Sequence, residues 1–148
     1  MREILFKGKN ERGSWEYGFY VKSEYYEGGI SHLIIDADNV HYDNNDFALV
    51  EYINPDTLCE YTGLTDKSGS KVFEGDIFKL DKENITGVVR YGRYANPFNN
   101  DPNKTHIGFY VEWNDRLQLL RQDLGFWCNE CDVVGNIFDN PELIENKE

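Results

Sequence analysis

The chain has 148 residues, 40% of them apolar and 15% aromatic, which suffices for one domain with its own core and excludes an intrinsically disordered chain. Its formal net charge of −12 argues against a generic duplex-DNA binder, because such a protein needs clustered cations against the phosphates. No apolar run approaches the ~20 residues of a membrane helix, and the N-terminus lacks the apolar segment of a signal peptide. We therefore expect a cytoplasmic protein that has no contact with a membrane.

The first 55 residues predict an antiparallel β-meander. Residues 15–22 alternate Trp, Tyr, Phe and Val with polar or small neighbours, which is the period of two of a strand with one buried side. Asn54 before Pro55 predicts a capped helical turn, because the Asn side chain accepts a backbone N–H and proline fits the first helical position. Further strands are expected at residues 4–7, 32–35 and 48–53, with a turn at 10–13, a break at 27–29 and a polar loop at 36–46.

A β-hairpin is expected next, between residues 59 and 77. Asp66-Lys67-Ser68-Gly69 has the chemistry of a tight turn, because the carboxylate can accept a backbone N–H and the glycine is free to take a positive φ. Strands at residues 77–80 and 85–91 then follow, separated by a turn at 81–84. This order of short strands looks like the start of a small SH3-like β-barrel.

The C-terminal part is less regular. Residues 92–106 show no apolar period and predict a long exposed loop, which in a compact domain is either functional or disordered. Strands are expected at residues 107–113 and 133–138, a strand or a helical turn at 117–124, and a second capped turn at Asn140-Pro141.

The charge is unevenly distributed along the chain. Residues 23–66 hold ten acidic residues and no Lys or Arg, and residues 122–146 hold six more acids without a cation. Two interpretations stay open. The acids either keep an aromatic-rich protein soluble, or they form a face that meets a basic partner, such as a nucleic-acid-binding protein.

Cys128-Asn129-Glu130-Cys131 is the motif that most resembles a metal or redox site. A closed zinc site needs four ligands, and the remaining Cys59 and the three histidines lie far apart in the sequence. A thioredoxin-type role would need the pair to open a helix, whereas this pair sits between apolar, β-like segments. Structural thiols are the favoured interpretation over zinc or redox activity, and we expect no metal and no cofactor.

Other carboxylates give no catalytic site. The run from Asp36 begins like a calcium loop, but Val40 and His41 stand where an oxygen ligand and a glycine are required. Glu74 and Asp76 flank Gly75, a pattern that indicates a turn rather than an acid–base pair. No G-x-S-x-G elbow and no phosphate-binding glycine loop is present, so we expect no catalytic residues.

The candidate partner-binding residues are Arg90, Tyr91, Arg93, Tyr94 and Phe98. Two arginines interleaved with two tyrosines beside a long loop can stack on bases or contact phosphates. The same residues also fit the rim of a barrel, with each arginine paired to a neighbouring acid, or a contact with a protein. All three interpretations remain open at this point.

Six segments carry a family resemblance: Arg2-Glu3-Ile4, Trp15-Glu16-Tyr17-Gly18, Tyr61-Thr62-Gly63-Leu64, Gly75-Asp76-Ile77, Gly87-Val88-Val89 and the run from Gly135 to Leu143. With them, the chain resembles the YopX family of small phage and prophage proteins, and the central and C-terminal segments are the most specific. The resemblance implies a β-rich fold with an SH3-like barrel and an origin in a phage or an integrated element. It supplies no catalytic residues, and the segment 92–106 is longer than the connection that it implies.

We therefore expect a mainly β fold, with an N-terminal antiparallel meander (residues 1–55) packed on a C-terminal SH3-like barrel region (residues 56–148) and one or two short helical turns. The expected function is non-enzymatic: binding to a host or phage protein in the bacterial cytoplasm, through acidic and aromatic surfaces. The alternatives are a nucleic-acid-binding barrel that acts through Arg90, Arg93 and the 92–106 loop, and a hydrolase, which has little support. Duplex DNA is not an expected partner, whereas single-stranded nucleic acid and a second copy of the chain stay open.

Overall fold

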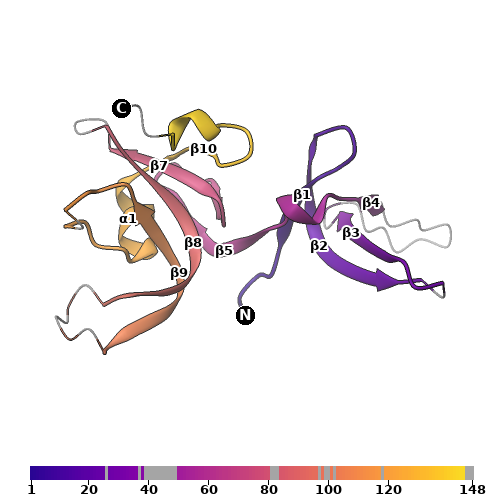
Figure 1. Cartoon of the computed structure of the whole chain (residues 1–148), viewed down its shortest axis with the longest axis horizontal. Helices are drawn as coiled ribbons and strands as arrows, with labels where there is room; N and C mark the ends of the chain where they lie inside the picture. Colours follow the sequence, from indigo (N-terminus) through magenta and orange to yellow (C-terminus); the bar gives the residue numbers. More distant parts are fainter. Residues whose placement is uncertain are drawn as a thin grey trace. The chain divides into compact units, whose positions relative to one another are not determined.

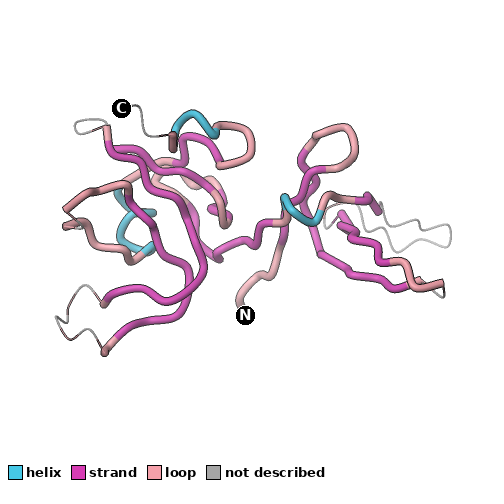
Figure 2. The backbone as a smooth tube through the Cα atoms, viewed as in Figure 1, coloured by secondary structure: helices cyan, strands magenta, loops and turns pink. Residues whose placement is uncertain are grey.

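The computed structural model describes residues 1–25, 27–36, 38, 50–80, 84–96, 98, 101, 103–117 and 119–145. These residues form two antiparallel sheets, one short α-helix and two 3-10 turns (Figures 1 and 2). The expected mainly β fold is therefore confirmed. The chain divides into two compact units, Met1–Tyr61 and Thr62–Glu148.

The first unit contains the N-terminal meander. Its strands follow one another in the order β4-β3-β2-β1, and β5 pairs with the free side of β1. Within the meander, Phe19 of β2 lies opposite Ile35 of β3, which lies opposite Val50 of β4. The elements are β1 (Phe6–Lys9), β2 (Trp15–Glu24), β3 (Ile30–Asp36), β4 (Val50–Tyr52) and the 3-10 turn η1 (Pro55–Thr57). The strand β5 (Cys59–Thr65) begins in this unit and ends in the second.

Two asparagines and a glycine shape this unit. Asn10 Oδ1 accepts the backbone N–H groups of Arg12 and Ser14 at 3.0 Å each, which fixes the turn between β1 and β2. Asn54 Oδ1 accepts the backbone N–H of Asp56 at 3.0 Å and caps η1, as the sequence predicts. Gly8 leaves the space that Ile53 fills, because a Cβ atom at Gly8 would lie 2.7 Å from Ile53 Cδ1.

The second unit contains the β5–β6 hairpin and a four-stranded sheet with the order β10-β7-β8-β9. In the described part of the chain this ladder does not close on itself, so the expected barrel is present only as an open, curved sheet; Figure 1 shows β8 and β9 as a long bent hairpin. The elements are β6 (Lys71–Phe73), β7 (Asp76–Leu80), β8 (Ile85–Ala95), β9 (Thr105–Trp113), α1 (Leu124–Glu130), β10 (Val133–Asn136) and the 3-10 turn η2 (Pro141–Leu143).

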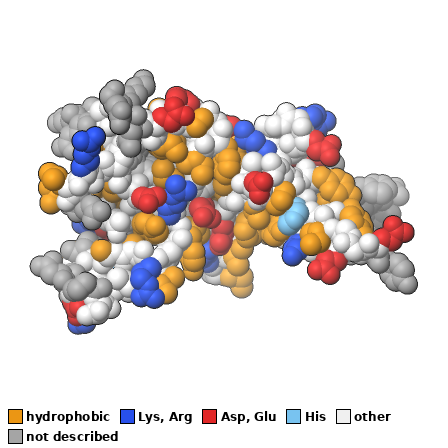
Figure 3. All heavy atoms as spheres, viewed as in Figure 1, with side chains coloured by type: hydrophobic (Ala, Val, Ile, Leu, Met, Phe, Trp, Pro, Cys, Tyr) orange, Lys and Arg blue, Asp and Glu red, His pale blue; other side chains and the backbone are white. Residues whose placement is uncertain are grey.

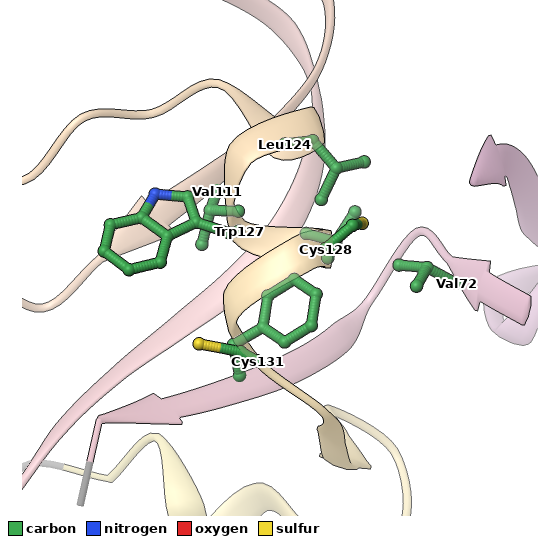
Figure 4. Packing of buried hydrophobic residues seen from close by; sticks show 8 residues of the cluster. Val72, Val111, Leu124, Trp127, Cys128 and Cys131 are labelled. Atoms are coloured by element: carbon green, nitrogen blue, oxygen red, sulfur yellow. The ribbon is translucent and has the colours of Figure 1, made fainter. Parts of the chain in front are cut away.

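The core of the second unit lies between α1 and this sheet. Figure 4 shows Leu124, Trp127 and Cys128 of α1 together with Val111 of β9 and Val72 of β6. The positions 124, 127 and 128 are spaced as one face of a helix, so a single turn of α1 supplies three core side chains. The whole buried cluster consists of Val72, Phe78, Val89, Val111, Leu124, Trp127, Cys128 and Cys131.

The expected tight turn between β5 and β6 is confirmed. Gly69 has φ +91°, in the left-handed region that favours glycine. The Asp66 carboxylate, which is 7% exposed, accepts the backbone N–H groups of Ser68 at 3.1 Å and of Ser70 at 2.8 Å. Its second oxygen accepts the backbone N–H of Val133 at 3.0 Å, so one side chain holds the turn closed and also ties it to β10.

The prediction of a loop over residues 92–106 is wrong at both ends. β8 continues to Ala95 and β9 begins at Thr105, with Arg93 opposite Ile107 and Tyr94 opposite His106. The sequence hides this pairing because glycines face each other at positions 92 and 108 and because aromatic or charged side chains occur on both sides of the hairpin. An apolar period arises only where one side of a strand is buried.

Three expectations near the C-terminus are also corrected. The Cys128–Cys131 pair lies at the end of a helix, not between strands: Cys128 belongs to α1, and Cys131 is its C-cap. The last strand ends at Asn136, because the Asn136 side chain accepts the backbone N–H groups of Phe138 and Asp139 and turns the chain. The 3-10 turn after Asn140 exists, but the Asn140 amide oxygen accepts from the backbone of Asn136 instead of capping the turn.

Candidate functional site

The candidate partner-binding residues do not share one surface of the β8–β9 hairpin. Because successive side chains of a strand point to opposite faces, Arg90 and Tyr94 lie on one face of β8, and Tyr91 and Arg93 lie on the other. Phe98 follows after the strand has ended. The segment that is continuous in the sequence is therefore divided between two faces in the structure.

On the face that carries Arg90, the aromatic rings pack on each other. Tyr94 stacks on Tyr110 with ring centroids 5.7 Å apart and an interplanar angle of 16°, and its ring lies 5.5 Å from that of His106. The two rings lie over the Gly92–Gly108 pair, since a Cβ atom at Gly92 would lie 3.7 Å from the Tyr110 ring and one at Gly108 would lie 3.9 Å from the Tyr94 ring, both ordinary van der Waals distances. This arrangement covers glycine backbone with aromatic rings, which is a structural role.

The arginines of the hairpin are engaged by neighbouring side chains. Arg90 Nε donates to Glu112 at 3.0 Å, an exposed ion pair across the strands, and Arg93 donates to the Thr105 hydroxyl at 2.9 Å. On the face drawn in Figure 3, Lys and Arg side chains are scattered among acidic and hydrophobic ones. These contacts support the interpretation of Arg90 as a rim residue whose charge is balanced by a neighbouring acid.

Phe98 contacts the segment that precedes α1. The Arg121 guanidinium lies 5.2 Å from the ring centre of Phe98 and 4.2 Å from that of Phe126, so it lies against both aromatic rings. Its two donors bind Asp123 at 2.6 Å each, and this hydrogen-bonded carboxylate raises the pKa of Arg121. Because Asp123 occupies the guanidinium fork, Arg121 serves to position this cluster and is not poised to bind an anion.

The three cysteines are buried thiols. The pKa of the Cys128 thiol is raised to about 11, chiefly by burial and then by the negative charge of Asp66 and the neighbouring Cys131. Such a thiol is protonated at neutral pH and is a poor nucleophile and a poor metal ligand. Among the described residues, no group of three or more His, Cys, Asp or Glu side chains is placed to hold a metal ion.

The other carboxylates singled out from the sequence lie in turns. Asp76 is buried and accepts the backbone N–H of Phe73 at 2.8 Å, and Gly75 has φ +85°, so this segment is the tight turn that the sequence predicts. Asp36 accepts the backbone N–H of Asp38 at 2.9 Å. Val40 and His41, which decide against a calcium loop in the sequence, lie outside the described residues.

A further surface, which the sequence did not single out, lies on the sheet of the first unit. Two rows of cross-strand neighbours run over β2, β3 and β4, and we call these six residues the apolar face: Phe19, Ile35, Val50 in one row and Val21, Leu33, Tyr52 in the other. Phe19 is 49% exposed, Val21 37%, Val50 46% and Tyr52 55%. The alternation along β2 predicted one buried side, but the side with the large apolar residues is exposed, whereas Gly18 and Ile34 of the opposite side are buried.

Charge divides the same sheet into two sides. Because directly opposite residues share a face, every acidic residue at a paired position of β1 to β5 in this unit lies on the side opposite the apolar face. This acidic face consists of Glu16, Glu24, Asp36, Glu51 and Glu60. The cations Lys7 and Lys9 lie on the same side as the apolar face, near its β1 end, and both place their ammonium groups over the ring of Trp15.

Hydroxyl groups fix the rim of the apolar face. Ser31 Oγ donates to the Tyr25 hydroxyl at 2.5 Å, and the Tyr25 and Tyr52 hydroxyls are 3.2 Å apart. The hydrogen bond from Ser31 and then that from Tyr52 lower the pKa of Tyr25, whereas the pKa of Tyr52 is raised by its bond to Tyr25. Both rings are thus held by their polar ends while their apolar edges stay exposed.

The fold and these surfaces define a class: a two-unit, mainly β protein with an exposed apolar sheet face and an acidic face behind it. The chain belongs to the YopX family, since the family model described as YopX protein matches residues 10–145. This match confirms the resemblance found in the sequence. A search among curated proteins gave no match. None of the helices in the described ranges is long and apolar enough to cross a membrane.

Proposed function

We propose that this protein is a non-enzymatic, protein-binding module of a phage or prophage, and that it binds a host or phage protein through the apolar face. The observation that carries the proposal is a pair of apolar rows without a carboxylate among them, in which the outer four residues are exposed and Leu33 and Ile35 are half-buried, in a chain with a net charge of −12. Membership of the YopX family supports the phage origin.

The size of this surface supports an interaction site. The six residues of the apolar face, extended by the exposed Tyr17 and Tyr25, present of the order of 600 Å² of side-chain surface, if an aromatic side chain has about 200 Å². Monomeric proteins rarely expose larger contiguous apolar patches than this, and large patches usually mark binding sites. A partner that covers these side chains gains the free energy of burying apolar surface.

The distribution of charge indicates the chemistry of the partner. The apolar face offers no carboxylate to a cation, so the contact surface of the partner is itself apolar and not basic. A basic protein would meet the acidic face, on the other side of the sheet. In place of one combined acidic and aromatic surface, the proposal therefore assigns binding to the apolar side of the sheet and leaves the acids on the other side.

The proposal is tested with two variants of equal net charge. Phe19→Lys with Tyr52→Lys changes the charge by +2 on the apolar face, and Glu24→Lys changes it by +2 on the acidic face. Each partner found by capture on the wild-type protein is purified and titrated calorimetrically against all three proteins. We expect the double variant to bind at least tenfold more weakly, the Glu24→Lys control to match the wild type, and binding to show a negative heat-capacity change. Equal affinities for the double variant and the wild type would refute the proposal.

A further inference from the structure

We propose that the partner of the apolar face is a second copy of the same chain, and that two copies pack face to face around a two-fold axis into a β-sandwich. The inference rests on the proposed function, because it names the occupant of the same surface. Three observations carry it: the complementarity of the apolar face to itself, the position of the acids, and the size of the exposed patch.

The apolar face is self-complementary in side-chain size. A two-fold axis parallel to β3 and midway between two facing sheets places β2 of one copy over β4 of the other, and it keeps each row at its own level along the strands. Phe19 then faces Val50 of the other copy, and Val21 faces Tyr52. In both pairs a large side chain meets a small one, which is the condition for two sheet faces to interdigitate.

The middle of the interface follows from the same axis. The axis runs directly above β3, so the two β3 strands face each other, with Leu33 opposite Leu33 of the other copy and Ile35 opposite Ile35. Facing sheets are separated by about 10 Å, a distance that branched aliphatic side chains from both sides fill. The outer strands β2 and β4 each carry one aromatic residue and one valine, and the middle strand β3 carries two aliphatic residues. The two-fold rotation therefore places complementary residues opposite each other.

The acids allow this approach despite the net charge of −12 on each copy. The acidic residues of the sheet point away from the apolar face, so in the sandwich the two acidic faces lie on opposite outer sides. Their separation exceeds two Debye lengths, each about 8 Å at physiological ionic strength, and their repulsion is largely screened. Contact through the acidic faces would instead bring like charges together.

The exposed area fits a dimer of moderate affinity. A standard protein interface buries about 800 Å² on each partner, and the patch of the order of 600 Å² supplies the larger part of this area as its apolar centre. Lys9 and Ser23 lie on the same side of the sheet, at its margin, and provide polar groups around that centre. The arrangement of an apolar centre and a polar rim is typical of interfaces between identical subunits.

Sedimentation equilibrium of the full chain, from low micromolar to submillimolar concentration, tests the inference. We expect a monomer–dimer equilibrium in the wild type and in Glu24→Lys, and a dissociation constant at least about 100-fold higher in Phe19→Lys with Tyr52→Lys, because each substitution is present twice in the dimer. Raising the salt concentration from low to physiological should strengthen the wild-type dimer, because it shortens the Debye length to about 8 Å, well below the separation of the acidic faces, and does not weaken apolar contacts. Circular dichroism and thermal melting confirm that each variant is folded.

An exchange of side chains tests the two-fold arrangement itself. Phe19→Val opens a gap against the small residue of the other copy, and Val50→Phe places two large side chains against each other, so each single variant should weaken the dimer about tenfold or more. The double variant restores one large and one small residue in every pair, and we expect its dissociation constant within about threefold of the wild type. If the two single effects add in the double variant, the two-fold arrangement is wrong.

The outcomes separate this inference from the proposed function. A wild-type protein that stays monomeric at all concentrations overturns the inference, and so does a dimer that survives Phe19→Lys with Tyr52→Lys. If the monomer still binds another protein through the apolar face, with the variant pattern given above, the proposed function stands without the second copy. If the wild-type protein is monomeric and the double variant Phe19→Lys with Tyr52→Lys binds its partners as tightly as the wild type, the dimer inference and the proposed function are both overturned.

Discussion

Replacing Asp66 by Ala should destabilise the second unit by about 3 kcal/mol. The carboxylate is 7% exposed and accepts three backbone N–H groups, at 3.1 Å from Ser68, 2.8 Å from Ser70 and 3.0 Å from Val133. Each hydrogen bond to such an acceptor contributes about 1 kcal/mol net, and donors that remain buried without an acceptor add to the cost. This side chain therefore stabilises both the turn between β5 and β6 and its connection to β10, in addition to the backbone hydrogen bonds of the turn.

A neighbouring carboxylate provides the control. Asp132 also accepts the backbone N–H of Ser68, at 2.9 Å, but it is exposed and makes one such bond, so Asp132→Ala should cost below about 1 kcal/mol. Asp66→Asn keeps one acceptor oxygen, but its amide group would present a donor to the Val133 N–H. Its loss of stability should therefore lie between those of Asp66→Ala and Asp132→Ala.

Urea unfolding followed by tryptophan fluorescence measures the effect. In a Trp15→Phe background all emission comes from Trp113 and Trp127, which both belong to the second unit, so the transition reports on that unit. We expect a lower midpoint with an unchanged m-value for Asp66→Ala. A midpoint equal to that of Asp132→Ala would refute the reasoning, because it would mean that the three hydrogen bonds do not stabilise the fold.

The remaining predictions concern the turn glycine, the thiols and nucleic acid. Gly69→Val should lower stability by about 1 kcal/mol or more, because the backbone at φ +91° is strained for a β-branched residue although no atom lies within 4 Å of the added Cβ; an unchanged melting temperature would contradict this. Cys128 should be alkylated about 100-fold more slowly in the folded protein than in urea at pH 8, because a pKa of about 11 against the ordinary 9.0 leaves that much less thiolate; equal rates would contradict the burial. Elemental analysis should find well under one zinc per chain, and one tightly held zinc would show that the Cys128–Cys131 pair is a metal site. Labelled duplex DNA should bind weakly or not at all at about 150 mM salt, and micromolar binding that is lost in Arg90→Glu with Arg93→Glu would favour the nucleic-acid alternative.

Local sequence chemistry was sufficient where one residue type dictates the backbone. The turn from Asp66 to Gly69 and the cap at Asn54 were predicted correctly, because a carboxylate or amide that accepts a nearby N–H acts within a few residues of itself. The strands β2 and β9 were predicted from their alternation. Each of these signals is contained in a short window of sequence.

The helix α1 was not predicted because tertiary packing, rather than its own local sequence, stabilises it. Its sequence contains Gly125 and three residues of low helix propensity, Phe126, Trp127 and Cys128, and the side chain of the N-cap Asp123 makes no capping bond because it binds Arg121. Packing of one helical face into the core of the second unit compensates for this weak propensity. The spacing of Leu124, Trp127 and Cys128 was the available signal, but it covers a single turn.

The apolar face shows the corresponding limit for sheets. A period of two reports that the two sides of β2 differ, but it does not tell which side the rest of the protein covers. In this sheet Gly8 on the acidic side allows Ile53 to approach closely, and Gly18 on that side is buried, while Phe19 and Val21 on the other side are exposed. The alternation therefore identifies a strand whose two sides differ in polarity. Only the pairing register of β2, β3 and β4 shows that the apolar side forms a continuous surface.

The separation of charge across this sheet connects the composition to the proposed assembly. If the ten acidic residues between positions 23 and 66 were spread over both sides, every approach of a second copy would be repelled at short range. Because those at paired positions lie on one side only, the net charge opposes association through the acidic face and leaves the apolar face as the side on which two sheets can meet. A strongly negative chain is in this way compatible with one specific apolar contact, and its charge contributes to the specificity of that contact by opposing the others.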